Sequence, residues 1–316
     1  MTAGFAPLRP RLPLRIGNRV VELGERTLIM GIVNCTPDSF YPGERNLEPA
    51  GAIRRYEQVV DEGADWVDVG GESTRPGAEP VDAEEEWRRI RPVIDAARRR
   101  GHPIPLSVDT TKHEVAARAL DQGAAIVNDV SGLAFDARLA ELAAHYRAAL
   151  VLMHMRGDPR TMQKDPRYRD VVQDVRSFLA AAVARARARG VAENQILVDP
   201  GIGFGKTLAH NLELLRRLHE FALLRRPLLI GCSRKGFIGA LTGAPLEERL
   251  EGSLAAHAAA VCAGAHVVRV HDVRAHVRAM RVLDAVRAAH DPARTGGAAE
   301  TGGFVRKSGP EQTSGG

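Results

Sequence analysis

Polar and charged side chains recur at the ends of short apolar runs throughout this 316-residue chain. Eight such clusters occur, at 34–40 (NCTPDSF), 70–77 (GESTRPG with its leading Gly), 107–110 (SVDT), 128–129 (ND), 153–155 (MHM), 199–206 (DPGIGFGK), 233–235 (SRK) and 269–272 (RVHD). Together they supply carboxylates, amides and cations, which could bind a flat, multi-donor ligand that carries an anionic group. Reactive side chains at the carboxyl ends of eight strands are typical of the active site of a (β/α)8 barrel.

The spacing within the clusters predicts which side chains share a face. Arg269 and His271 are two residues apart, so in a strand they point to the same side, opposite their valine neighbours. Asp109 and Asp199 each end a predicted strand and are expected to project into the same cleft. Two fixed carboxylates suit a ligand with several N–H donors, such as a 2-amino-4-oxo pteridine. A purely structural ion pair remains an alternative for Arg269.

The glycine-rich segment 199–206 does not fit a nucleotide-binding loop. A P-loop needs a glycine five residues before Gly205, where Pro200 stands, and no G-x-G-x-x-G can be drawn. The glycines instead favour a tight loop that passes close to a flat ligand, with Phe204 as an apolar wall. Nearby, His154 lies between two methionines and is expected to be a packed histidine rather than a metal ligand.

Two long segments, 34–46 and 70–80, are rich in Gly, Pro, Ser and Thr and are predicted to be mobile lids. They carry Asn34, Asp38, Phe40, Ser73, Thr74 and Arg75. Such side chains offer oxygen ligands for a hard cation and donors for a phosphate. Ordinary solvated loops are the alternative. The cations of 233–235 lie where barrels often bind phosphate, although a ligand carbonyl or carboxylate would serve as well.

Eight alternating strand and helix patterns are predicted to position these clusters. Strands are expected at 28–35, 66–70, 104–109, 126–130, 149–154, 196–199, 227–232 and 266–271, and helices at 49–62, 82–100, 112–122, 136–146, 170–190, 207–220, 246–263 and 273–289. The fold class is therefore α/β, a (β/α)8 barrel. An N-terminal hairpin over 12–27, turning at Gly17-Asn18, is expected to close the bottom of the barrel. We expect a flexible segment 1–11, a single domain 12–290 and a disordered tail 291–316, which is rich in Gly, Ser and Thr.

Composition excludes several classes of protein. The net charge is +5, but aromatic residues are only 4% of the chain, which leaves little material for stacking nucleobases. No apolar run approaches the roughly 18–20 residues that span a bilayer. The three cysteines have no C-x-x-C spacing, which indicates a reducing compartment rather than a disulfide framework. We expect a cytoplasmic protein with no nucleic-acid or membrane partner.

Taken together, the clusters resemble the dihydropteroate synthase family over roughly residues 26–288, in family order and with family-like spacing. The resemblance implies that 6-hydroxymethyl-7,8-dihydropterin diphosphate and p-aminobenzoate are condensed to 7,8-dihydropteroate by SN1-like displacement of diphosphate, in folate biosynthesis. It also implies Mg²⁺ as cofactor, sulfonamides as inhibitors and a homodimer. The apolar segment 253–263 is a candidate interface, although a helix that faces the core has the same pattern.

The resemblance also assigns roles to residues. The pterin would be bound by Asp109, Asn128, Met153, Asp199, Phe204, Lys235 and Arg269. The diphosphate would be bound by Asn34, Ser73, Thr74, Arg75, Arg269 and His271, and Asn34 would also be a metal ligand. The p-aminobenzoate pocket would comprise Phe40, Thr74, Pro76, Phe204, Lys235 and Gly236. The catalytic set would be Asp38, Arg75, Asp109, Lys235, Arg269 and His271.

Two positions depart from the family pattern. Gly236 stands where many members have a serine, which removes a hydroxyl contact to the arylamine carboxylate. The first loop reads YPGE at 41–44 rather than the commoner D-G-G, which bears on how that loop closes. Two other functions are weighed: a methyltetrahydrofolate–corrinoid methyltransferase of the same barrel superfamily, which would not need Asp38 or Arg75, and a non-catalytic pterin-binding relative.

Overall fold

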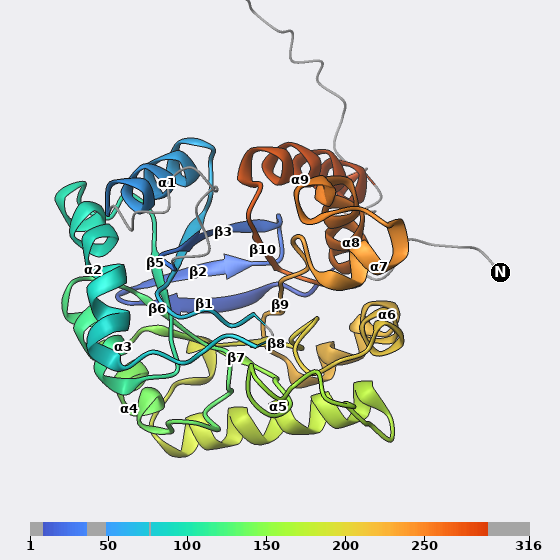
Figure 1. Cartoon of the computed structure of the whole chain (residues 1–316), viewed down its shortest axis with the longest axis horizontal. Helices are drawn as coiled ribbons and strands as arrows, with labels where there is room; N and C mark the ends of the chain where they lie inside the picture. Colours follow the sequence, from blue (N-terminus) through green and yellow to red (C-terminus); the bar gives the residue numbers. More distant parts are fainter. Residues whose placement is uncertain (1–8, 37–48, 76, 290–316) are drawn as a thin grey trace, which may run out of the picture.

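A computed structural model describes residues 9–36, 49–75 and 77–289 of the chain. Its centre is a sheet of eight parallel strands: β3 (Leu28–Asn34), β4 (Trp66–Gly70), β5 (Leu106–Asp109), β6 (Ile126–Asp129), β7 (Ala149–Met153), β8 (Ile196–Asp199), β9 (Leu229–Ile230) and β10 (Val267–Val270). The strand order is β8-β7-β6-β5-β4-β3-β10-β9, and a parallel bridge from Val198 to Leu228 brings the two ends together. The predicted α/β barrel is confirmed, with a near-closed sheet surrounded by helices (Figure 1).

Nine α-helices lie in the described part of the chain: α1 (Pro49–Asp61), α2 (Ala83–Arg99), α3 (His113–Asp121), α4 (Arg138–Tyr146), α5 (Val171–Ala188), α6 (Leu208–Arg216), α7 (Gly236–Thr242), α8 (Leu250–Cys262) and α9 (Val273–Ala288). Three 3₁₀ turns accompany them: η2 (Glu193–Gln195), η3 (Leu218–Leu224) and η4 (Leu246–Glu248). Helix α2 illustrates how the sequence sets the bounds. The Asp82 side chain accepts from the Glu85 N–H at its start, and Ile90, Val93 and Ile94 form the buried stripe.

The element pattern differs from prediction in three places. Helix α7 was not expected, because it has seven residues including two glycines, too few for a periodic signal. A Cβ at Gly239 would lie 2.3 Å from the Arg249 guanidinium, so a larger residue there would have to displace the Arg249 side chain. The helix expected at 207–220 divides into α6 and η3, and the one expected at 246–263 divides into η4 and α8.

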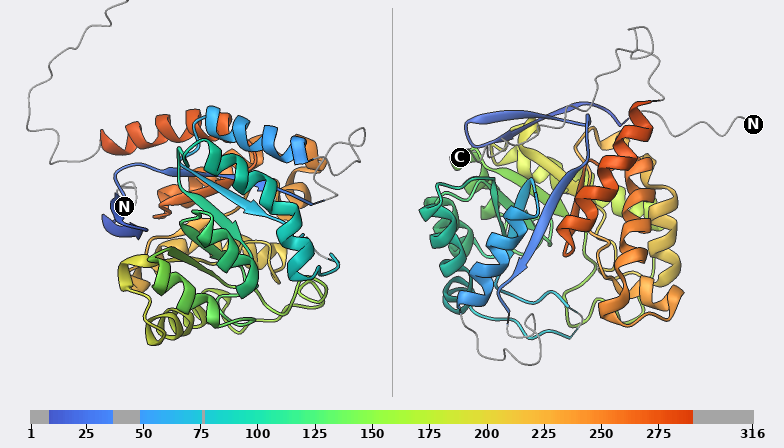
Figure 2. Two further views of the ribbon diagram at one scale, coloured as in Figure 1. Left: turned by 90° about the vertical axis from the view of Figure 1, so that its left-hand side faces the viewer. Right: turned by 90° about the horizontal axis from the view of Figure 1, so that it is seen from above.

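The predicted hairpin is present as β1 (Leu12–Ile16) and β2 (Arg19–Leu23). It lies across one end of the barrel (Figure 2). Leu14, Ile16 and Leu23 are buried there against Met30 and Trp66, which point into the barrel near the amino ends of their strands. Because apolar side chains fill this end, the polar interior side chains are confined to the carboxyl ends of the strands.

Arg9 connects the start of the described chain to its last helix. Its guanidinium donates to Thr27 Oγ1 at 2.9 Å, to the Ala265 carbonyl at 2.8 Å and to Asp284 Oδ1 at 3.3 Å. Arg9, which falls within the predicted flexible segment 1–11, is thus anchored by its side chain. Residues 1–8 and the whole predicted tail 291–316 lie outside the described residues. In the ranges that the structure describes, no helix is both long and apolar enough to cross a membrane.

Candidate active site

A cavity of about 1120 Å³ lies at the carboxyl ends of the barrel strands. All the predicted site residues that the structure describes line it: Asn34, Ser73, Thr74, Arg75, Asp109, Asn128, Met153, Asp199, Phe204, Lys235, Gly236, Arg269 and His271. The remaining three, Asp38, Phe40 and Pro76, lie outside the described residues. Residues at or just after the carboxyl ends of all eight strands therefore meet in one place, as the spacing predicted.

A buried ion-pair network forms the floor of the cavity. Arg269 Nε donates to Asp68 Oδ2 at 2.6 Å, and Arg269 Nη2 donates to Asp109 Oδ2 at 2.6 Å. Asn128 Nδ2 donates to the same Asp68 oxygen at 2.9 Å. One guanidinium thus holds two carboxylates. The structural ion pair considered for Arg269 is real, and the residue lines the cavity as well.

Asp68 is the functional residue that sequence reasoning missed. It is fully buried, two positions after Trp66 and therefore on the interior side of β4. That alternation was the available signal, but Asp68 lies inside an apolar run rather than in a polar cluster. Because Asp68 takes the Asn128 Nδ2 hydrogen bond, Asn128 presents its amide oxygen to the cavity as an acceptor.

Burial makes both cavity carboxylates weak acids. Desolvation raises the pKa of Asp109 to about 7. The Arg269 guanidinium lowers this pKa, and the Asp68 carboxylate raises it. Desolvation likewise raises the pKa of Asp199 to about 6, opposed by the Gly201 N–H, which donates to Oδ1 at 2.7 Å, and by Lys235. A ligand with N–H donors would stabilise both ionised carboxylates.

Lys235 is held against the glycine-rich loop. Its Nζ lies 3.9 Å from the centroid of the Phe204 ring, within cation–π range. Gly203 has φ +85°, and a Cβ there would lie 3.1 Å from Lys235 Cδ. Desolvation, together with Arg269, lowers the pKa of Lys235 to about 8. A Cβ at Gly201 would lie 2.0 Å from the His154 carbonyl. The loop glycines therefore make room for Lys235 and for the segment that follows β7.

A second buried lysine, Lys206, fixes the far end of this loop. Its Nζ lies 2.9 Å from His154 Nδ1 and 2.9 Å from the Phe204 carbonyl. The His154 ring packs edge-on against Phe178, and burial lowers the pKa of this histidine to about 2. His154 is thus a packed residue, as predicted. Lys206 is a cavity residue that the sequence reasoning left without a role.

His271 is oriented by Ser233. The Ser233 Oγ accepts from the His271 backbone N–H at 3.1 Å and lies 3.0 Å from the ring Nδ1. When the hydroxyl donates to Nδ1, the ring proton is on Nε2 and is available to a ligand. Burial, with Arg269 and Arg234 close by, lowers the pKa of His271 to about 3. His271 is therefore a neutral N–H donor at neutral pH.

A chain of hydrogen bonds between buried histidines supports the segments around this residue. The Cys232 N–H donates to His257 Nε2 at 2.9 Å, His257 Nδ1 lies 3.0 Å from His276 Nε2, and His276 Nδ1 lies 2.8 Å from the Asp272 carbonyl. Each ring then has one donor and one acceptor nitrogen, so both are satisfied as neutral imidazoles. Burial lowers the pKa of both histidines.

The second predicted lid is anchored at its base. Glu72 accepts from Lys112 Nζ at 2.7 Å and from the Val81 N–H at 3.1 Å, and Lys112 also contacts the buried Glu86. Ser73, Thr74 and Arg75 follow and line the cavity, and Arg75 is exposed. The loop thus carries the exposed cation of Arg75, and the ion pairs of Lys112 with Glu72 and Glu86 anchor it where it leaves β4.

The donors near Asn34 fit a metal only together with a bound anion. Within the described ranges, no group of three His, Cys, Asp or Glu side chains is placed to hold a metal ion. Asn34 and Thr36, whose side chains have oxygen atoms, both line the cavity. Mg²⁺ is commonly bound by one or two protein ligands together with substrate phosphates, and this donor set is compatible with that mode.

The fold and cavity define a barrel enzyme that binds a polar heterocycle, and the comparisons with known proteins specify its class. A family model described as "Pterin binding enzyme" matches residues 30–271. The dihydropteroate synthase of Synechocystis sp. is 46% identical over 276 residues, covering 87% of this chain and 95% of the relative. Dihydropteroate synthase of Yersinia pestis, solved with a sulfonamide drug, is 40% identical, with a TM-score of 0.82, covering 88% of this chain and 100% of that one. The Burkholderia cenocepacia enzyme, complexed with 7,8-dihydropteroate, is 43% identical, with a TM-score of 0.79, covering 90% and 98%.

The chain belongs to the dihydropteroate synthase family. Its activity is that of a dihydropteroate synthase, and the predicted resemblance is confirmed. These matches favour that activity over the corrinoid methyltransferase considered above.

Proposed function

We propose that this chain condenses 6-hydroxymethyl-7,8-dihydropterin diphosphate with p-aminobenzoate to give 7,8-dihydropteroate and diphosphate. The observation that carries the proposal is the convergence of Asp109, Asn128, Asp199, Lys235 and Arg269 on one cavity. This set pairs acceptors with donors, as the edge of a 2-amino-4-oxo pterin requires. The B. cenocepacia relative, whose structure contains 7,8-dihydropteroate, supports the assignment.

In the proposed complex, the pterin lies over the ion-pair network. Asp199 and the Asn128 oxygen accept ring N–H groups, and Lys235 donates to a ring acceptor. Arg269 and Met153 contact the ring faces, and Phe204 forms the outer wall. Asp109, fixed by Arg269, faces a ring N–H and stabilises positive charge that develops on the ring.

The diphosphate is assigned to the opposite side of the cavity. Its ligands there are Asn34, Ser73, Thr74, Arg75, Arg269 and His271. His271 contributes a neutral N–H, and the two arginines contribute charge. Mg²⁺, held by Asn34 and by the diphosphate itself, would neutralise part of the negative charge on the leaving group.

The p-aminobenzoate pocket is assigned to Phe40, Thr74, Pro76, Phe204, Lys235 and Gly236. Gly236 opens α7, so its backbone N–H is a donor at a helix start. A Cβ at Gly236 would meet nothing within 4 Å. The place of the serine hydroxyl that many family members have is therefore open space here.

The reaction proposed is an SN1-like substitution. The bond between the pterin methylene carbon and the diphosphate oxygen breaks, and both electrons leave with the diphosphate. Arg75 and His271 stabilise the departing anion, while the ring shares the charge left on the methylene. The p-aminobenzoate nitrogen then forms the new C–N bond and releases its proton to water. Asp38, Arg75, Asp109, Lys235, Arg269 and His271 form the catalytic set.

The test is an assay of diphosphate release with and without p-aminobenzoate and Mg²⁺, together with detection of dihydropteroate. Release that requires both additions supports the proposal. Methyl transfer from methyltetrahydrofolate would indicate the corrinoid enzyme, and pterin binding without turnover would indicate a non-catalytic relative.

We also propose that residues 12–290 form a single domain that dimerises in the cytoplasm. Helix α8 has its buried side at Ser253, His257 and Ala260, while Ala255 and Ala259 are exposed on its other side. On α9, Val282 and Val286 are 66% and 47% exposed. These apolar side chains on α8 and α9 are the candidate interface. Light scattering on the purified chain distinguishes a dimer from a monomer.

A further inference from the structure

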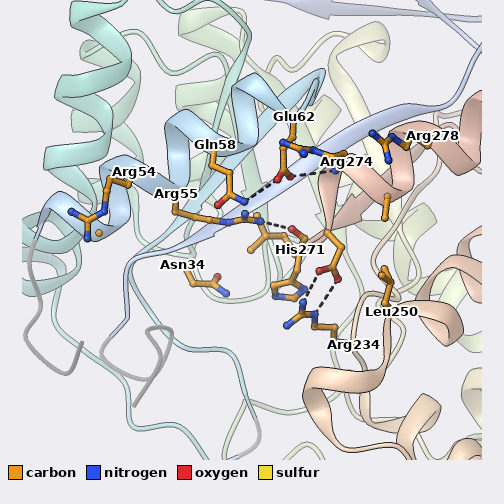
Figure 3. A pocket seen from close by; sticks show the side chains of 14 residues that line it. Asn34, Arg54, Arg55, Gln58, Glu62, Arg234, Leu250, His271, Arg274 and Arg278 are labelled. Carbon is orange, nitrogen blue, oxygen red and sulfur yellow. Dashed lines mark hydrogen bonds and ion pairs between the residues drawn. The ribbon is translucent and has the colours of Figure 1, made fainter. Parts of the chain in front are cut away.

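A second cavity, of about 1040 Å³, opens beside the first and is bordered by α1 and α9 (Figure 3). We call it the arginine groove. Among the lining residues that the structure describes, five arginines stand against two carboxylates, an excess of three positive charges: Arg54, Arg55, Arg234, Arg274 and Arg278 against Glu62 and Asp272. An excess of this size in a concave surface attracts multivalent anions.

Internal pairing does not use up this charge. Arg234 pairs with Asp272, with Nε 3.0 Å from Oδ2, and Arg55 donates to the His271 carbonyl. Glu62 accepts from the Gln58 amide at 2.8 Å and from the Arg274 backbone N–H at 3.3 Å, rather than from a guanidinium. The two acids are thus already engaged.

Arg274 and Arg278 carry the free charge of the groove. Both are exposed, and among the described residues neither guanidinium has an acidic partner. They are one helical turn apart on α9, where like charges repel each other. Both side chains project from α9 on the groove side, near Glu62, which directly follows α1 (Figure 3). An anion between them would remove that repulsion and could accept from two planar, multi-donor groups.

The groove adjoins the active-site cavity. Ile32, Asn34, Arg234 and His271 line both. Two of these, Asn34 and His271, are assigned above to the diphosphate. His271 therefore stands at the boundary between the active-site cavity and the arginine groove.

We infer that the arginine groove is a second anion-binding site, which receives the product diphosphate as it leaves the active site. This inference rests on the diphosphate role proposed for His271. Diphosphate carries several negative charges and accepts in the forked geometry that guanidinium groups favour. Binding here keeps the anion near the protein while vacating His271, so the next pterin diphosphate can bind before the old product has diffused away.

The experiment titrates inorganic diphosphate into the full-length protein by calorimetry, in low-salt buffer with Mg²⁺. We expect two sites in the wild type. Arg274→Gln/Arg278→Gln should lose the groove site, with its affinity at least about tenfold weaker, because glutamine keeps the length and helix propensity but removes the charge. His271→Ala should lose the other site and keep the groove site. The matched control, Arg99→Gln/Arg281→Gln, removes the same charge from two exposed arginines that line neither cavity.

Steady-state kinetics give the second readout. The groove variant should keep the KM for both substrates within about twofold, while the inhibition constant of added diphosphate changes by at least about fivefold. A single diphosphate site in the wild type that responds only to His271→Ala overturns the groove and leaves the proposed function intact. Equal weakening by the control variant also overturns it, since that result reflects net charge alone. Loss of diphosphate binding only in the groove variant, with none in His271→Ala, contradicts the diphosphate role of His271 instead.

Discussion

Asp199 shows how burial adjusts a binding carboxylate. Its pKa is raised to about 6, and that of Asp109 to about 7, because both are desolvated. Both must be ionised to accept ring N–H groups. Lys235, with its pKa lowered to about 8, must be protonated to donate. The three groups therefore define the pH range in which the pterin binds.

We predict that the affinity for a pterin without diphosphate is highest near pH 7–8. Below about pH 6–7, ligand binding must expel a proton from a carboxyl group, so affinity should fall by up to about tenfold per pH unit. Above about pH 8, deprotonation of Lys235 should weaken binding again. Calorimetry from pH 5 to 9 measures the profile, and Asp199→Asn should bind at least about 100-fold more weakly at pH 7–8, with a smaller difference at pH 5, where Asp199 is protonated in the wild type. A flat wild-type profile would contradict the assignment of these groups.

Asp68 is predicted to act through Arg269 and Asn128 rather than by touching the substrate. Asp68→Asn removes the charge that both side chains share, and we expect kcat/KM to fall by roughly 10- to 100-fold, the loss of one charged hydrogen bond. Asp68 also raises the pKa of Asp109, so the acid limb of the pH profile should move to lower pH. Asp61→Asn, on the outer face of α1, is the control. An unchanged acid limb together with reduced activity would point to a merely structural role.

At the scale of elements, rigid strands carry the ring-binding residues and a loop carries Arg75. Asp109 and Asp199 end β5 and β8, and Asn128 is the second-last residue of β6, whereas Arg75 follows the Glu72 anchor on an exposed segment. Binding of the ring and binding of the anion are thus assigned to different kinds of element.

We therefore predict that Arg75→Ala lowers kcat strongly, by about 100-fold or more, while the affinity for a bare pterin changes less than about threefold. In the same variant, p-aminobenzoate should lose the gain in affinity that pterin, diphosphate and Mg²⁺ confer on the wild type, because the anion supplies the differential energy that orders the loop. Titrating p-aminobenzoate with and without these ligands measures that gain. If the wild type bound p-aminobenzoate equally well in both cases, the loop would have no part in forming the pocket.

One regularity in the sequence, a polar cluster after each short apolar run, predicted both the strands and the site residues. Strand alternation placed Arg269 beside His271, and the polar clusters identified the side chains of the cavity. What escaped prediction depends on three-dimensional contacts. Asp68 lies in an apolar stretch of sequence, and its ion-pair partner Arg269 is some 200 residues away. Helix α7 is too short to show a helical period of apolar residues. The arginine groove likewise joins α1 to α9, which no local pattern relates.

At the scale of the whole molecule, Arg9 links the two ends of the barrel domain. Arg9→Ala removes the guanidinium donor of the Ala265 carbonyl and the cation paired with Asp284, which keeps its hydrogen bonds from Thr27, so we predict a loss of about 3 kcal/mol in the free energy of unfolding. This corresponds to a melting temperature lower by roughly 6 °C. Arg11→Ala, at an exposed neighbouring position, should leave the melting temperature unchanged. Equal melting temperatures for the two variants would show that the anchor contributes nothing.

The single bridge between Val198 and Leu228 makes one side of the barrel a seam. β9 has two residues, and this join consists of that bridge and the hydrogen bond from the Val198 N–H to the Pro227 carbonyl, at 3.0 Å. Asp199 ends β8, on one side of the seam, and Lys235 follows β9, on the other. A pterin bound to both residues would therefore act as a non-covalent cross-link between the two ends of the sheet. Hydrogen–deuterium exchange at 196–199 and 227–232 should then slow on pterin binding, while exchange across the β4–β5 join stays as it was. In this enzyme the substrate would be part of what closes the barrel.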